Sequence, residues 1–490
     1  MKKIFSLILL SLTLSFYAEA QQMELESYDL HKCNIVTAER TLVVGEYGNE
    51  VVSVVDPARG ILATHQDFEV HAFNQNHTTR TLELADTKGY ELITTNIVEG
   101  KLYLLFSNRT KNSYALLRGV VNLADMTLST PLTPIYQEET AKSDIDHLRA
   151  AKSDNGDFIG LAFGVYHNAT QEFQSHEMLL DNTLEELWVK QYPMNPVNAV
   201  YVTNEGQLKT MGYYNNKKNQ NTKFIFGEFD ENGEDVQEVM LDVTNVEYGQ
   251  LLNCINGKFV FVGLLGDGRE VNTTYSGIYG VVYDLNSHRA LSNTHEFTND
   301  EINVFENSSL KSKVRNAIMN GLDPRSTAAT DFGGAVSYAR RYSVITTDMK
   351  YGSTRTECYQ TGAMVIALDT NCNFVWNKPI RTFLKESERS CSHHVNICAQ
   401  GNTVYVVQSE AAKNGEVYDI SPKCKQKFFN RFKSRTAVYA IAQDGTVSKR
   451  MLGEAERNKI TTPLMSAGNG VYWFVSSVPL SSTLNKLQIK

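Results

Sequence analysis

The sequence lacks a second long apolar segment, an excess of basic residues and the short motifs that mark common catalytic centres. After the N-terminal run Ile4–Ala18, no stretch approaches about 18 consecutive apolar residues, so we expect no membrane span. The formal net charge is −8, from 47 basic and 55 acidic residues. Binding to nucleic acid or to anionic lipid needs a basic surface, so we expect neither partner.

Motifs of well-known catalytic and metal centres are also missing. The chain has no HExxH, no CxxC pair and no GxSxG. Asp230, Asn232 and Glu234 alternate like the start of a calcium loop, but the sixth-position glycine and the terminal glutamate are absent. These three residues therefore indicate a hairpin turn. We predict no catalytic residues, no metal site and no cofactor.

Cysteine is sparse and odd in number. The seven are Cys33, Cys254, Cys358, Cys372, Cys391, Cys398 and Cys424. An exported protein can form disulfides, but an odd count leaves at least one thiol unpaired. Any bridge is expected to join two of the five cysteines that lie in the region from Cys358 to Cys424, with no particular pairing predicted. Cys358 and Cys372 flank one strand and make an unfavourable pair. Buried, unpaired cysteine in β-sheet is the alternative.

What the sequence does contain is a short hairpin signature that recurs about every fifty residues. Each copy is an apolar strand, a tight turn with glycine and a second apolar strand. Glycine supplies the positive φ that such turns require. The turns lie at Glu99-Gly100, Asn155-Gly156, Glu205-Gly206, Asn256-Gly257, Gln400-Gly401 and Asn469-Gly470. A fixed period built from β-hairpins is typical of propeller blades.

A second series of turns alternates with the first and completes four-stranded blades. Its turns lie at Asp56-Pro57 through Gly60, Ala124-Asp125, Asp181-Asn182, Asn232-Gly233, Asn286-Ser287, Thr370-Asn371 and Asp444-Gly445. Six units fit between Gly89 and Arg450, and a seventh combines Thr41–Phe68 with the segment after Thr461. We predict a single all-β propeller of four-stranded blades, seven in number, closed by N- and C-terminal strands. Eight blades are the alternative, with Lys32–Thr37 as an inner strand and the N-terminal segment as a whole blade.

This rhythm resembles that of secreted bacterial β-propeller proteins in general, over essentially all of the chain after residue 20. No WD dipeptide, kelch Gly-Gly pair, sialidase box or quinoprotein tryptophan motif recurs. The resemblance therefore implies a fold and an exported protein, without a specific family or its catalytic residues. A closed ring leaves only short, protected strand edges, so we expect a monomer.

The N-terminus has the pattern of a signal peptide. Lys2 and Lys3 precede the apolar run, and Ala18-Glu19-Ala20 is a small-x-small cleavage pattern. Residues 1–20 are the predicted signal peptide and residues 21–490 the propeller domain. The mature domain would carry 45 basic and 54 acidic residues, a net charge of −9. We expect export to the periplasm or the cell exterior of a Gram-negative-type bacterium.

Two stretches interrupt the period. Thr298–Leu322 is predicted as a helical insertion, with Thr298 as N-cap, Glu301 completing a capping box, and Asp323-Pro324 as its stop. Glu410–Arg435 is a basic loop insertion with phenylalanines between its lysines and arginines. Packing of these aromatics onto the propeller is the simpler interpretation, and contact with an acidic partner is the alternative.

Superposing the blades brings a set of polar residues to the start of the innermost strands, near the axis. The predicted binding residues there are Glu91, Asp144, Asp146, His147, Arg149, Asn198, Tyr248, His393 and His394. Adjacent His393 and His394 point to opposite faces of a strand, so one metal ion could hardly take both. Each blade can contribute a side chain at this mouth, which favours a binding site.

Two functions fit these observations. The first is an exported, non-catalytic binding or scaffold propeller that engages a protein or a glycan, and it follows from a large folded surface without assembled chemistry. The second is a carbohydrate-active hydrolase or lyase that uses Asp144 or Asp146 with His147, Arg149 and Tyr248 at the mouth. A hydrolase needs two carboxylates about 5–10 Å apart, and a lyase needs a base and a cation.

Overall fold

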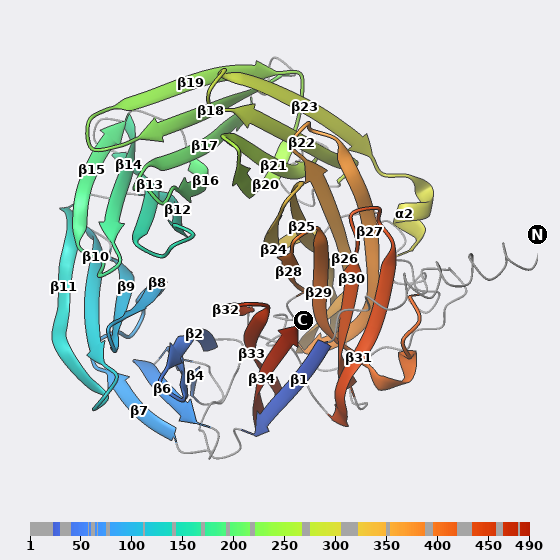
Figure 1. Ribbon diagram of the computed structural model, residues 1–490, viewed down its shortest axis with the longest axis horizontal. Coiled ribbons are helices and arrows are strands. Elements are labelled where there is room, and N and C mark those ends of the chain that lie inside the picture. The colour runs from blue at the N-terminus through green and yellow to red at the C-terminus, as the bar shows by residue number, and fades with distance from the viewer. Residues whose placement is uncertain are drawn as a thin grey trace, which may run out of the picture.

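Eight four-stranded antiparallel sheets surround a central axis in the computed structural model, and they are numbered blades 1 to 8 (Figure 1). The first strand of each blade lies nearest the axis and the fourth lies at the rim. The structure describes residues 23–29, 41–56, 58–59, 64–65, 67–74, 79–110, 113–139, 144–167, 172–192, 197–215, 221–266, 275–304, 322–348, 353–387, 395–418, 434–456, 464–478 and 481–490. An all-β propeller of four-stranded blades is confirmed.

Blades 1 to 4 follow one another along the first half of the chain. Blade 1 contains β2 (Thr41–Tyr47), β3 (Glu50–Val55), β6 (Phe68–Asn74) and β7 (Thr79–Leu84), and blade 2 contains β8 (Glu91–Val98), β9 (Lys101–Arg109), β10 (Ser113–Asn122) and β11 (Thr127–Glu139). Blade 3 contains β12 (Asp144–Lys152), β13 (Phe158–His167), β14 (Glu172–Asp181) and β15 (Glu186–Tyr192), and blade 4 contains β16 (Val197–Val202), β17 (Leu208–Asn215), β18 (Thr222–Phe229) and β19 (Glu234–Leu241). A small extra hairpin, β4 (Ala58–Arg59) with β5 (Thr64–His65), lies between β3 and β6.

Blades 5 to 8 complete the ring. Blade 5 contains β20 (Val246–Ile255), β21 (Lys258–Leu265), β22 (Gly277–Asp284) and β23 (Arg289–Glu296), and blade 6 contains β24 (Leu322–Thr330), β25 (Gly333–Asp348), β26 (Ser353–Asp369) and β27 (Phe374–Ser387). Blade 7 contains β28 (Asn396–Gln400), β29 (Thr403–Ala411), β30 (Ser434–Ile441) and β31 (Val447–Glu456), and blade 8 contains β32 (Met465–Gly468), β33 (Val471–Val478), β34 (Ser481–Ile489) and β1 (Met23–Asp29).

The predicted number of seven blades is wrong, and the error lies in one strand. An outer turn at Asp56-Pro57 would make the residues before it, Val51–Val55, the third strand of a blade. In the structure these residues are in β3, the second strand of blade 1, which pairs with β2 on one side and β6 on the other. The N-terminal segment therefore forms a whole blade, and the ring has eight. Lys32–Thr37, the inner strand of the eight-blade alternative, lies outside the described residues.

The two chain ends close the ring, as predicted, but the N-terminal strand in the closing blade is Met23–Asp29 and not the predicted Thr41–Phe68 segment. Strand β1 pairs with β34 in antiparallel register from Met23↔Ile489 to Asp29↔Thr483, so blade 8 takes its outermost strand from the N-terminus. Leu484, Leu487 and Ile489 of β34 are almost fully buried between blades 7, 8 and 1. Closure thus depends on hydrogen bonds and apolar packing between segments far apart in the sequence.

All six predicted glycine turns join the first and second strands of a blade. At Asn256-Gly257 both residues have positive φ, 51° and 71°, as the tightest hairpin turns require. The two blades missed by this signature have different turns. Blade 1 turns at Gly48-Asn49, and blade 6 turns at Asp331-Phe332 without glycine in the turn itself. The predicted turns of the second series join the third and fourth strands of a blade. The exception is Asp56-Pro57, which follows the second strand of blade 1.

The predicted long helix is not supported. The structure describes one short helix there, α2 (Asn299–Asn303), which begins at the predicted N-cap Thr298 with the predicted Glu301 capping box. Residues 305–321 lie outside the described residues. Leu322 begins strand β24, and Asp323 and Pro324 pair with β25 instead of ending a helix. The capping signal is confirmed, and the extension of the helix to Leu322 is not supported.

Other predictions fall partly outside the described residues. The predicted signal peptide lies entirely outside the described residues, and so do residues 419–433 of the basic insertion.

Among the described cysteines, Cys254, Cys372 and Cys398 are unpaired, and burial raises the pKa of each thiol to about 12. These three thiols are therefore protonated and weakly reactive. No described helix has the length and apolarity to cross a bilayer.

One carboxylate is buried in blade 3 without a cation. Glu177 on β14 is 0 % exposed; Ser175 donates to its Oε1, while Oε2 has no hydrogen-bond partner among the described residues. Lys190, its neighbour in register on β15, donates instead to the Gly233 carbonyl at 2.7 Å. Burial, with a smaller contribution from the charge of Glu234, raises the pKa of Glu177 from 4.5 to about 7.

Glu177→Gln should therefore change how stability depends on pH. Between pH 4.5 and 7 the folded state keeps the Glu177 proton that the unfolded state releases, so the free energy of unfolding falls as pH rises, by about 3 kcal/mol in total. Urea unfolding at pH 5 and pH 8 should show Glu177→Gln near wild type at pH 5 and more stable at pH 8. Identical pH dependence of the two proteins would contradict this. Glu410→Gln, at a buried but ion-paired glutamate, should be destabilising at both pH values.

Candidate functional site

Six innermost strands share an irregularity close to their first residues. The register with the second strand shifts between Val43 and Gly45, Leu92 and Thr94, Asp146 and Arg149, Val197 and Ala199, Glu247 and Gln250, and Pro324 and Ser326. Such bulges redirect side chains and are common next to binding sites. Because the blades repeat the same strand order, these bulges lie on one face of the ring around its axis. We call the N-terminal ends of the innermost strands the axial mouth.

Three predicted residues occupy these bulges. His147, Asn198 and Tyr248 lie at the shifts of blades 3, 4 and 5, with Arg149 immediately after the first of them. Glu91 is the first residue of β8 and is exposed. The side chains of Asp144, Asp146 and His147 lie outside the described part of the chain, as do residues His393 and His394 entirely.

Arg149 and Asn198 connect neighbouring blades at the mouth. The Arg149 Nε donates to the Asn198 carbonyl oxygen at 3.2 Å, so the guanidinium of blade 3 is held against blade 4. The Asn198 side-chain oxygen accepts a hydrogen bond from the backbone N–H of Tyr213 at 3.1 Å. These contacts fix a cation beside a polar backbone segment, and the structure thereby brings two of the predicted residues together.

Tyr248 is an exposed aromatic residue on a strained backbone. Its side chain is 43 % exposed, and its φ is +45°, in the left-handed region that bulky residues rarely adopt. The Tyr338 hydroxyl donates to the Tyr248 carbonyl at 3.1 Å, and the Tyr275 ring meets its ring edge-on at 6.0 Å. Backbone strain of this kind costs of order 1–3 kcal/mol and gathers at functional sites. The fold thus holds an aromatic face at the mouth.

Glycine is required next to Tyr248 for steric reasons. A Cβ at Gly249 would lie 2.0 Å from the Phe261 ring and 2.8 Å from the Tyr279 hydroxyl, so β20 lies directly on these aromatic residues. The Tyr213 phenol hydrogen-bonds to the backbone of Gly249. This contact joins blade 4 to the bulge of blade 5 and supports the position of Tyr248.

The Tyr213 phenol near the mouth acts as a hydrogen-bonding group at neutral pH. Burial, with the charge of Glu247, raises the pKa of Tyr213 to about 12, while Arg149 acts in the opposite direction. Sequence reasoning missed Tyr213, Tyr275 and Tyr338 because it aligned only the innermost strands. These three residues belong to second strands and to the segment before β22, and no periodic signal marks them.

The fold that this strand pairing defines is an eight-bladed β-propeller. No protein-family model matches the sequence, and neither does any curated protein. Solved structures similar to the chain are propellers, and the strand pairing itself carries the assignment because their TM-scores are below 0.5. The β-propeller domain of the Trilobed protease from Pyrococcus furiosus has a TM-score of 0.38 and 10% identity, covering 86% of this chain and 98% of that one.

Two further solved structures are similar to the chain over most of its length. The WD40 domain of SCAP from fission yeast has a TM-score of 0.36 and 8% identity, covering 96% of this chain and 98% of that one. The polysaccharide lyase Uly1 has a TM-score of 0.39 and 8% identity, covering 95% of this chain and 99% of that one. At such identities the similarity concerns the fold alone.

Proposed function

We propose that the chain is an exported, non-catalytic binding propeller that engages a glycan at the axial mouth. The observation that carries this proposal is Tyr248, an exposed ring held in strained backbone at the bulge of an innermost strand. A fixed aromatic face can pack against the C–H groups of a sugar ring without losing side-chain freedom on binding. Strain kept at an exposed position is a reason to expect a function there.

The polar neighbours suit the same ligand. Arg149 and Asn198 lie on the two preceding blades and offer donors and acceptors to hydroxyl or carboxylate groups of a glycan. Innermost strand β16 contacts both β12 and β20, so the three positions are neighbours around the axis. One ligand that spans them would bind through aromatic packing, which gives affinity, and through directed hydrogen bonds, which give specificity.

The described contacts at the mouth support a binding role, because Tyr248 offers an exposed aromatic face and Arg149 and Asn198 offer hydrogen-bonding groups. The Tyr213 phenol is protonated at neutral pH, so it is no general base there. The enzymatic alternative uses Asp144 or Asp146 with His147, Arg149 and Tyr248, and the side chains of Asp144, Asp146 and His147 lie outside the described residues.

The test is binding of the mature chain, residues 21–490, to a panel of neutral and acidic glycans, followed by titration of the best ligand. Tyr248→Ala and Arg149→Ala should each weaken binding at least tenfold and change the melting temperature by only a few degrees, since both residues are at a solvated strand end. Arg289→Ala, an exposed arginine on β23 at the rim, is the matched control and should bind like wild type. Equal affinity of all four proteins would refute the proposal.

A further inference from the structure

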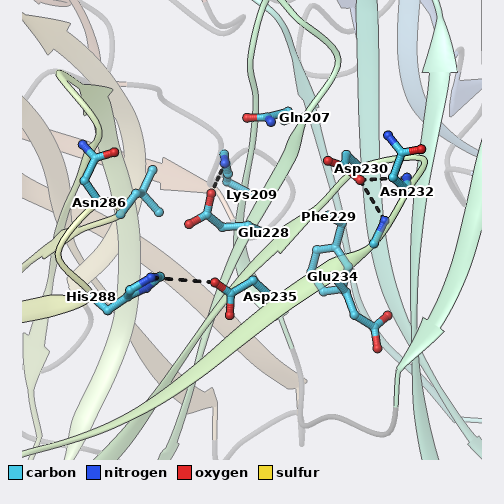
Figure 2. Close-up of a pocket in the computed structure, with 12 residues that line it drawn as sticks. Gln207, Lys209, Glu228, Phe229, Asp230, Asn232, Glu234, Asp235, Asn286 and His288 are labelled. Carbon is cyan, nitrogen blue, oxygen red and sulfur yellow. Dashed lines mark hydrogen bonds and ion pairs between the residues drawn. The ribbon is translucent and has the colours of Figure 1, made fainter.

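A pocket of about 550 Å³ lies at the rim between blades 4 and 5, on the opposite face from the axial mouth (Figure 2). The pocket surrounds the turn from β18 to β19 and the turn from β22 to β23. Both turns lie at the ends of these blades that are opposite the axial mouth. Glu228 and Asp235 come from the first pair of strands, and His288 comes from the second turn. This pocket shares no residue with the proposed glycan site.

The carboxylates of Glu228 and Asp235 are direct neighbours across two strands. The two residues are opposite each other in the antiparallel register of β18 and β19. Like charges in this relation are destabilising unless a cation lies between or beside them. Lys209 on β17 forms an ion pair with Glu228, whereas Asp235 has the His288 Nε2 at 3.8 Å, too far for a direct hydrogen bond.

The net charge of the pocket is negative. Its lining includes four carboxylates, from Glu228, Asp230, Glu234 and Asp235, against the single ammonium of Lys209. Asp230 is satisfied by its own turn, because its Oδ1 accepts from the backbone N–H groups of Asn232 and Gly233 at 2.8 Å each. The predicted hairpin at this calcium-like sequence is thus confirmed. The carboxylates that group with His288 are those of Glu228 and Asp235.

The imidazole of His288 is oriented by a second residue. Its Nδ1 is 3.0 Å from the Tyr283 hydroxyl, and the Tyr283 ring stacks flat on Phe226 of blade 4 with centroids 3.8 Å apart and planes 2° apart. This arrangement turns Nε2 toward Asp235, as Figure 2 shows. Histidines that bind metals are held in the same way, through a hydrogen bond on the other ring nitrogen.

We propose that Glu228, Asp235 and His288 bind a divalent transition-metal ion of the zinc class and thereby join blades 4 and 5. One ligand atom from each of the three residues lies within 4.8 Å of the others. Tetrahedral zinc with bonds of about 2.0–2.1 Å needs ligand separations of about 3.3 Å. The half-exposed side chains of Asp235 and His288 can make this approach.

The donor set decides the kind of ion. An imidazole nitrogen with two carboxylates suits zinc and its neighbours, whereas calcium and magnesium prefer oxygen ligands alone. Lys209 occupies one side of the Glu228 carboxylate, so the metal would take the other oxygen. Three protein ligands leave a fourth position that faces the pocket, open to water or to an atom of a ligand.

The test is calorimetric titration of zinc into chelator-treated mature protein. Wild type should bind one zinc ion at this site, and zinc should raise its melting temperature. His288→Ala should weaken this binding at least a hundredfold, and Tyr283→Phe should weaken it about tenfold by freeing the imidazole. His295→Ala, a partly exposed histidine that pairs with Glu301 at 3.0 Å, is the matched control and should bind zinc like wild type.

Each other outcome overturns the metal site. A wild-type protein that binds no zinc would overturn it. Equal zinc affinity of wild type and His288→Ala would also overturn it, because zinc would then be bound by cysteines or other histidines. Calcium that binds as tightly as zinc and is unaffected by His288→Ala would show that the carboxylates act alone. Circular dichroism of His288→Ala, a substitution at an exposed turn residue, verifies that the fold is retained.

Discussion

A chain that ends before Ser481 is expected to lose its whole fold cooperatively, and not only to fray at one blade. Removal of β34 deprives β33 and β1 of the strand between them and exposes the apolar surface that closes the ring. Leu484, Leu487 and Ile489 are at most 3 % exposed. At about 1.5–3 kcal/mol for each buried aliphatic side chain, their loss amounts to about 5–9 kcal/mol, comparable to the total stability of about 5–15 kcal/mol of a typical domain.

Thermal unfolding followed by circular dichroism measures this effect. The truncated chain should show no cooperative transition, or one tens of degrees lower than that of residues 21–490. Removal of Lys490 alone is the control, since its ammonium forms only an exposed ion pair with Glu24 at 3.0 Å and such pairs contribute little. A truncated chain that melts like the intact one would show that the ring does not depend on closure by its ends.

Lys449→Met should be the most destabilising of the single substitutions considered. Lys449 Nζ donates to Glu410 Oε1 at 2.6 Å, and both side chains are 1 % exposed in blade 7. The Tyr439 hydroxyl and the Asn414 amide also donate to this carboxylate. Removal of the only cation in this set leaves a buried negative charge, at a cost of about 3–5 kcal/mol.

Urea unfolding at neutral pH checks this expectation, with two comparisons. The double variant Glu410→Gln, Lys449→Met should recover part of the lost stability, because an amide replaces the uncompensated carboxylate. Lys223→Met removes a half-exposed ion pair with Glu238 and should cost no more than about 1 kcal/mol. A Lys449→Met protein as stable as the Lys223→Met protein would contradict the role assigned to burial.

The fold was largely predictable because its rhythm is local. Turns with glycine or Asn-Gly need a left-handed backbone that few other residues adopt, so they marked six of the eight inner hairpins. The inner turns of blades 1 and 6, at Gly48-Asn49 and Asp331-Phe332, were not marked by this signal. Blade 6 was still counted from its outer turn, so the count failed only at blade 1. Whether Val51–Val55 is a second or a third strand depends on which strands pair with it, and an apolar run alone does not contain that information.

The candidate site was less accessible to sequence reasoning. Alignment of the innermost strands found Tyr248 at the aligned position of the repeat and Asn198 one residue after it, but the bulges that redirect them appear only in the strand register. Tyr213, Tyr275 and Tyr338 come from other strands of the blades. The rim cluster of Glu228, Asp235 and His288 has no sequence motif, because one blade supplies the carboxylates and the next supplies the imidazole.

The most direct test of glycan binding at the axial mouth is hydrogen exchange of the mature chain, measured by mass spectrometry with and without the best glycan from the panel. The account predicts slower exchange at residues 144–152, 197–202 and 246–255, which form the innermost strands of blades 3, 4 and 5. Exchange at the rim turns 230–233 and 285–288 should stay unchanged. Protection confined to the rim, with the mouth unaffected, would contradict the account.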